Sequence, residues 1–251
     1  MELWRSVVVA VTLLGLPGAA ARAADDPPPF FDPVVTITPG ITREADILFD
    51  HVRTSSSQLS QPSLRLQYPV QPWLQLALEM PVVILDRDTE SSVTTAGDLL
   101  LTAQARAWAS SDRPIEIDLG LELTLPTGDP DRLGGSTALR PFAAAGITLG
   151  RFDVIGNLSY QWFVAGPLTG TQVFQSTVAV GYLTRFIAPF VELTLTKPVR
   201  GPTDLRPQVA VVPGLEIFFP RGITLSIGVQ LPVSPARLFD QRVLGFLKLP
   251  F

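Results

Sequence analysis

The chain has 251 residues, of which 46% are hydrophobic and 17% carry a charge, and its formal net charge is −4. About 25% charged residues is typical of a soluble domain, so this composition is apolar for one. The net negative charge argues against a nucleic-acid-binding protein, which would have a basic surface. The sequence has no cysteine, which excludes disulfides and thiol chemistry.

No stretch beyond residue 25 supplies the roughly 18 consecutive apolar residues that a membrane-spanning helix requires. The chain is therefore apolar in total but not in any one long run. That combination is typical of a transmembrane β-barrel, in which each strand turns one apolar face to lipid.

The N-terminal region predicts export. Arg5 precedes the apolar run VVVAVTLLGLPGAAA, and ARA at 21–23 matches an A-x-A cleavage site. We therefore expect a signal peptide over residues 1–23. Residues 24–43 contain five prolines, which fix φ and supply no backbone donor. This segment is predicted to be an extended periplasmic leader that could reach into the barrel from below.

A period-two pattern begins at residue 44 and continues to the last residue. It is clearest in IEIDLGLELTLP at 115–126, where aliphatic residues alternate with polar ones that include Glu116, Asp118 and Glu122. Alternate side chains of a strand point to opposite faces, so one face is aliphatic and the other is acidic. The same pattern predicts twelve strands, near 44–54, 62–69, 73–84, 97–109, 115–126, 137–150, 153–164, 171–183, 187–198, 206–219, 222–232 and 242–251.

The connections between these segments alternate between short and long. The longer ones are predicted at 55–61, 86–96, 127–136, 165–170, 197–205 and 232–241. Outer-membrane barrels combine short periplasmic turns with longer external loops, and an even number of strands places both termini at the short-turn end. We predict an all-β fold, a single antiparallel transmembrane β-barrel of about 12 strands over residues 44–251.

Alternation alone also fits a soluble barrel with its apolar face inside, but two features favour lipid outside. Aromatic residues gather near the predicted short turns, as in an interfacial girdle: Tyr68, Trp73, Trp108, Phe152, Tyr182, Phe186, Phe218, Phe219 and Phe251. The aliphatic faces of the clearest strands also carry no charge, and an Arg or Lys there would cost about 2–4 kcal/mol at the bilayer midplane.

The strand charges fall instead on the opposite face, which we expect to line the lumen. The candidate lumen-lining residues are Arg65, Glu79, Arg106, Glu116, Asp118, Glu122, Arg140, Glu192, Glu216 and Lys248, with Arg242 beside them. The carboxylates at 116–122 predict either an acidic wall that selects cations or a wetted surface balanced by Arg106 and Arg140. The two interpretations are compatible, because lining charges tune selectivity even when they are paired.

The sequence ends on an apolar strand whose last residue is Phe251, with Val243, Leu247 and Leu249 at alternate positions before it. This ending resembles the assembly signal of bacterial outer-membrane proteins. The resemblance implies a Gram-negative outer membrane as the location, its lipid as a partner, and recognition of the C-terminal strand by the barrel-assembly machinery.

Three longer stretches resemble the outer-membrane transporter family named for the meta-pathway of phenol degradation. SLRLQYPVQPWLQLALEMPV is similar to an early hairpin of that family, although Pro69 stands where a Gly usually follows the Tyr. AGDLLLTAQARAW resembles its Gly-Asp strand start, and LELTLPTGD its strand ending in L-P-T-G. The resemblance implies passage of small, often hydrophobic molecules across the outer membrane. It carries no catalytic or binding residues.

Enzymatic readings have little support in the sequence. His51 is the only histidine, and the nearby Ser55–Ser57 form no recognised hydrolase motif. Asp129 and Asp131 lack the further ligands of a calcium loop. We therefore expect no catalytic, metal or cofactor site and passive passage of an unidentified small molecule. The alternatives are a lipid-modifying enzyme within the barrel and a soluble periplasmic barrel with an apolar ligand.

Overall fold

The computed structural model describes residues 30–87, 92–110, 114–129, 135–201 and 206–251. The expected signal peptide at 1–23 and the first residues of the leader, 24–29, lie outside this described part. Within the described part, no helix is long and apolar enough to cross a membrane.

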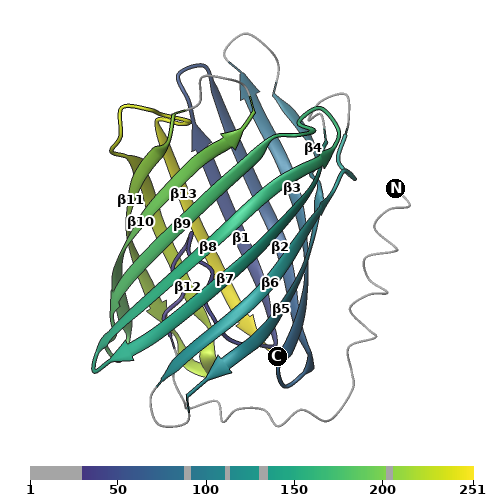
Figure 1. Cartoon of the computed structure of the whole chain (residues 1–251). Coiled ribbons are helices and arrows are strands. Elements are labelled where there is room, and N and C mark those ends of the chain that lie inside the picture. The colour runs from purple at the N-terminus through teal and green to yellow at the C-terminus, as the bar shows by residue number, and fades with distance from the viewer. Residues whose placement is uncertain (1–29, 88–91, 111–113, 130–134, 202–205) are drawn as a thin grey trace.

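Long tilted strands form one closed antiparallel sheet around a central space (Figure 1). The strands are β1 (Glu44–Arg53), β2 (Ser57–Gln71), β3 (Leu74–Arg87), β4 (Val93–Ala96), β5 (Leu99–Ala109), β6 (Ile115–Leu125), β7 (Thr137–Leu149), β8 (Phe152–Ala165), β9 (Gln172–Tyr182), β10 (Ile187–Arg200), β11 (Gln208–Phe218), β12 (Thr224–Pro232) and β13 (Gln241–Pro250). A single turn of 3-10 helix, Pro220–Gly222, connects β11 to β12.

The thirteen labelled strands form a twelve-stranded barrel, because β4 and β5 both pair with β3 and together act as one interrupted strand. Pairing of β1 with β13 over ten residue pairs closes the sheet. The predicted fold class, a twelve-stranded antiparallel barrel, is confirmed. With β4 and β5 counted as one strand, each strand pairs with the next along the chain, so the topology is the simplest that a closed barrel allows.

Two predicted connections differ from the structure. The loop expected at 86–96 contains the short strand β4, which pairs with β3. The loop expected at 55–61 is a three-residue turn at 54–56, where Thr54 N donates to the Ser57 carbonyl oxygen at 2.9 Å, and β2 already begins at Ser57. The polar run up to Pro62 resembles a loop in the sequence, yet Pro62 pairs with Phe49 of β1. On its other side, the regular pairing of β2 with β3 stops at Ser60 and resumes at Ser63, where the proline ring has no N–H to donate.

The two faces of the strands differ as the alternation predicts. On β6, Leu119 and Leu121 are 54% and 47% exposed, whereas Asp118 is 0% and Glu122 is 7% exposed. Exposed Leu, Ile and Val side chains also cover the outside of β8 to β12. The barrel therefore has an apolar outer surface and a polar, charged interior, which is the distribution expected of a lipid-embedded barrel.

Exposed aromatic side chains mark the short-turn end of the barrel: Trp73, Trp108, Phe152, Tyr182, Phe186, Phe219 and Phe251. Arg43 lies over the rings of Tyr68 and Phe251, 5.4 and 4.9 Å from their centroids. Phe218 departs from the predicted girdle, because it packs against buried residues inside the barrel.

Candidate functional site: the barrel interior and its plug

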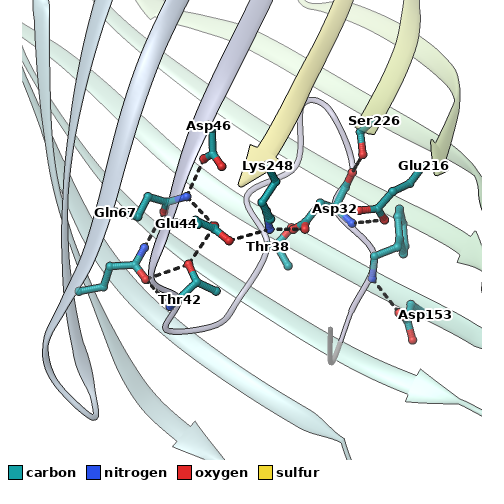
Figure 2. Close-up of polar contacts among 12 residues, drawn as sticks. Asp32, Thr38, Thr42, Glu44, Asp46, Gln67, Asp153, Glu216, Ser226 and Lys248 are labelled. Carbon is teal, nitrogen blue, oxygen red and sulfur yellow. Dashed lines mark hydrogen bonds and ion pairs between the residues drawn. The ribbon is translucent and has the colours of Figure 1, made fainter. Parts of the chain in front are cut away.

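Residues 30–43, which we call the plug, occupy the barrel interior. Figure 2 shows the segment rising into the barrel, arching over and returning to the start of β1. Its N-terminal part meets the short-turn end of the barrel at Asp153, the second residue of β8, and Glu216, near the end of β11. The middle part reaches deeper, to Glu192.

Two adjacent phenylalanines anchor the plug. Phe30 and Phe31 are 2% and 0% exposed and pack in a cluster with Ile155, Ala179, Ala188 and Phe190. The rings of Phe31 and Phe190 are stacked with centroids 5.3 Å apart. Burial of these two aromatic side chains removes a large apolar surface from water and so holds the plug inside the barrel.

Three inward-facing glycines of the barrel wall make room for the plug. A Cβ at Gly181 would lie 2.6 Å from the Phe31 ring, and one at Gly146 would lie 2.9 Å from both Phe30 and Pro39. At Gly228 a Cβ would lie 2.7 Å from Cγ2 of Val34. A larger side chain at any of these positions would force the plug to move. The shape of the inner wall is therefore complementary to that of the plug.

Four carboxylates of the wall, the plug-facing carboxylates, accept hydrogen bonds from plug backbone N–H groups. Glu192 accepts from Val34 N at 2.8 Å, from Val35 N at 3.1 Å, and from both N and Oγ1 of Thr36 at 2.8 and 2.7 Å. Three further bonds complete the set: Phe31 N to Asp153 at 3.0 Å, Asp32 N to Glu216 at 2.8 Å and Gly40 N to Asp118 at 2.8 Å.

Lys248 of the closing strand binds the plug through charge. Its Nζ forms an ion pair with Asp32 of the plug and lies 3.4 Å from Oε2 of Glu44, the first residue of β1 (Figure 2). Gln67 bridges Glu44 and Asp46 with two bonds of 2.8 Å. The plug is thereby attached at the seam where the first and last strands of the barrel meet.

A second set, the arginine-paired carboxylates, pairs with guanidinium groups of neighbouring strands. The pairs are Arg65–Glu79 at 2.6 Å, Arg106–Glu116 at 2.5 Å, Arg140–Glu122 at 2.6 Å and Arg242–Asp50 at 2.5 Å. The four arginine side chains are 27–37% exposed.

The plug does not fill the barrel completely. A cavity of about 220 Å³ lies between plug residues 32–42 and the walls. Its lining includes Arg65, Gln104, Glu122 and Arg140 together with Thr36 of the plug. Such a space holds water and small polar groups, and its polar lining can satisfy them.

The structure places all ten predicted charges, and Arg242, on the interior face and divides them between these networks. Residues that the sequence analysis missed complete the site: Phe30, Phe31, Gln75, Gln104 and Asp153. Gln75 accepts from Thr42 N at 2.6 Å, and Gln104 donates to Asp118 at 2.8 Å. Inward position on a strand was a usable signal for Gln75 and Gln104, but nothing local marked the two phenylalanines as an anchor.

Of the weaker candidates, the structure describes His51 and Asp129. His51 Nδ1 lies 2.9 Å from Oγ of Ser60 on the neighbouring strand β2, and its ring stacks on Phe49. Among the described residues no carboxylate hydrogen-bonds the imidazole, and no group of acids and histidine could hold a metal ion. Asp131 lies outside the described residues.

A family profile described as "Putative MetA-pathway of phenol degradation" matches residues 36–241. The chain belongs to this family. The predicted resemblance is thereby confirmed. No curated protein matches the sequence significantly.

Solved structures with a similar fold include an outer membrane channel and two porins. The COG4313 outer membrane channel from Pseudomonas putida F1 is 16% identical, with a TM-score of 0.68, covering 88% of this chain and 100% of that one. The NanC porin is 12% identical, with a TM-score of 0.58, covering 82% and 98%. A KdgM porin in complex with disordered oligogalacturonate is 10% identical, with a TM-score of 0.57, covering 82% and 99%. At these identities the likeness concerns the fold.

Proposed function

We propose that this protein is an outer-membrane channel that lets small molecules pass passively through the barrel interior. The observation that carries the proposal is the polar, charged interior with its cavity of about 220 Å³ inside an apolar outer surface. Family membership supports it, as do the channel and porins among the structures of similar fold.

In this proposal the ten predicted charges line the solute path, and the plug controls it. Residues 32–40 and Thr42 line the remaining cavity, so a solute must either pass beside them or displace them. The plug is attached by separable contacts, which include the aromatic anchor, hydrogen bonds to side chains of the wall and the ion pair between Asp32 and Lys248. Displacing it therefore requires no change in the strand pairing of the barrel.

The same proposal places the chain in the Gram-negative outer membrane after removal of residues 1–23. Phe251 would serve there as the assembly signal read by the barrel-assembly machinery. Its ring is half-exposed at the short-turn end and contacts Arg43, so it is accessible on a strand that must close the barrel. Cell fractionation with unboiled and boiled gel lanes tests this placement, and recovery in the soluble periplasm would contradict it.

Solute passage is tested by swelling of proteoliposomes in a neutral pentose. We expect slow swelling with the wild-type chain and faster swelling with Phe30→Ser/Phe31→Ser, which removes the aromatic anchor. Heat-modifiable migration establishes that both barrels are folded. Swelling no faster than that of protein-free liposomes, in both chains, would overturn the proposal.

A further inference from the structure

The interior carboxylates differ in how their charge is compensated. Each arginine-paired carboxylate has a cation within 2.6 Å. The four plug-facing carboxylates, Asp118, Asp153, Glu192 and Glu216, form no ion pair within the described residues, although all four are 0% exposed. Their oxygens instead accept hydrogen bonds from N–H donors of the plug backbone, which carry no net charge.

A buried carboxylate is costly unless hydrogen-bond donors or a cation compensate it. When the plug leaves, Glu192 loses four donor atoms and Glu216 and Asp153 each lose a backbone donor. Asp118 retains Gln104 alone. One oxygen of Asp118 and one of Glu216 already lack a partner with the plug in place. The opened interior therefore has four carboxylates in need of donors against one released ammonium group, that of Lys248, which loses Asp32 and keeps Glu44.

Plug residues 34–36 show what geometry these groups accept. Three successive N–H groups and one hydroxyl converge on the two oxygens of Glu192. An ammonium group presents three N–H donors from one point and adds the missing positive charge. A protonated amine thus replaces the plug's donors and also neutralises the carboxylate.

We propose that Asp118, Asp153, Glu192 and Glu216 form a cation-binding face that the plug covers, and that the open channel selects cationic solutes with N–H donors, such as organic amines. The inference rests on the proposed channel function and names its substrate class. The arginine-paired carboxylates contribute less to this selectivity, because a guanidinium group already compensates the charge of each. Charged side chains lining a pore set its ion selectivity.

The test uses the full chain with Gly181→Leu, which forces Phe31 from its seat and leaves all four carboxylates intact. Gly156→Leu is the matched control on the adjacent strand, where a Cβ meets only ordinary contacts of 3.6 and 3.9 Å. Phe30→Ser/Phe31→Ser is the second displaced variant, in case Gly181→Leu does not fold. Glu192→Gln/Glu216→Gln is then added to the displaced variant that folds.

Two readouts are needed: reversal potential in planar bilayers under a KCl gradient, and spermidine binding by calorimetry in detergent. We expect the displaced variants to favour K⁺ over Cl⁻ several-fold and to bind spermidine more tightly than the wild type and Gly156→Leu. Removing two carboxylates should weaken spermidine binding about tenfold or more and move the reversal potential towards zero.

The outcomes separate the two proposals. Spermidine binding that depends on the carboxylates, without any conductance, would retain the cation-binding face and overturn the channel function. Conductance without cation preference, or binding unaffected by Glu192→Gln/Glu216→Gln, would overturn the cation-binding face and retain the channel. Absence of both conductance and binding would overturn both.

Discussion

The plug-facing and the arginine-paired carboxylates occupy the same barrel interior but obtain their partners differently. Three of the arginine pairs join residues only 10–18 positions apart, on adjacent strands. The backbone bonds from the plug to the four plug-facing carboxylates join residues 78–184 positions apart. Local pairing thus balances charge within the wall, whereas contacts distant in sequence attach a removable segment to it.

Strand β6 shows both arrangements on one face. Glu122 lies directly opposite Arg140 and pairs with it. Asp118 lies opposite Arg106, yet Arg106 binds Glu116, and Asp118 instead accepts from Gln104 and Gly40. An arginine in register with a carboxylate is therefore not sufficient for an ion pair, because the plug competes as an uncharged partner.

The largest expected effect comes from removing the aromatic anchor. Phe31→Ala should weaken plug docking by about 3–5 kcal/mol, as for other buried phenylalanines. Amide hydrogen exchange of residues 31–40 should then accelerate by roughly a hundredfold or more, while the strand amides remain protected. Phe49→Ala, on the exposed outer face of β1, is the control and should leave plug exchange unchanged. Equal exchange in Phe31→Ala and wild type would contradict the anchor.

Removing the principal acceptor should have the next largest effect. Glu192→Ala leaves three backbone N–H groups and the Thr36 hydroxyl without their acceptor, which should cost about 1–3 kcal/mol of plug docking. Glu192→Gln retains one acceptor oxygen and should fall between Ala and wild type. Exchange of the amides at 34–36 measures both variants, and a glutamine variant that matches alanine would argue against the hydrogen-bond account.

A variant in the arginine-paired region should lower the stability of the barrel and leave the plug docked. Glu122→Leu leaves Arg140 inside the barrel without its carboxylate, and we expect a loss of about 1–2 kcal/mol, reduced because the Arg140 side chain is 27% exposed. Urea unfolding in lipid measures the loss, and Glu122→Leu/Arg140→Met should recover most of it. Plug exchange should remain as in wild type, so an accelerated plug would show that the two regions are coupled.

The smallest effect is expected at His51. Its bond to Ser60 lies on the outer face, near Phe49, and His51→Ala should change stability by no more than about 0.5 kcal/mol. Solute passage should be unaltered. Phospholipid hydrolysis by the wild type that His51→Ala abolishes would revive the lipid-enzyme alternative.

Much of the barrel could be predicted because its determinants are local. Alternation over residues such as 115–126 identifies strands and their two faces. The same alternation shows which charged residues point into the barrel. The start of β2 was missed because its serines and Pro62 resemble a loop, although the gap in the β2–β3 pairing between Ser60 and Ser63 accommodates the proline.

The plug contacts could not be predicted, because they depend on where the barrel wall places distant residues. The prolines of 24–43 exclude a helix but do not say what the segment contacts. Gly146, Gly181 and Gly228 are ordinary small residues in the sequence, and only the closed barrel shows that Phe30, Phe31 and Val34 occupy the space they leave. Asp153 follows a turn and gave no sign that it would bind Phe31.

The most direct test of plug control is conductance of a chain whose plug can be locked. A Cβ at Gly228 would lie 2.7 Å from Cγ2 of Val34, so Val34→Cys/Gly228→Cys brings two sulfurs within disulfide reach, and the chain has no other cysteine. We expect channel openings in the reduced protein to disappear on oxidation and to return with reductant. The same openings in both states, or none in either, would contradict the account.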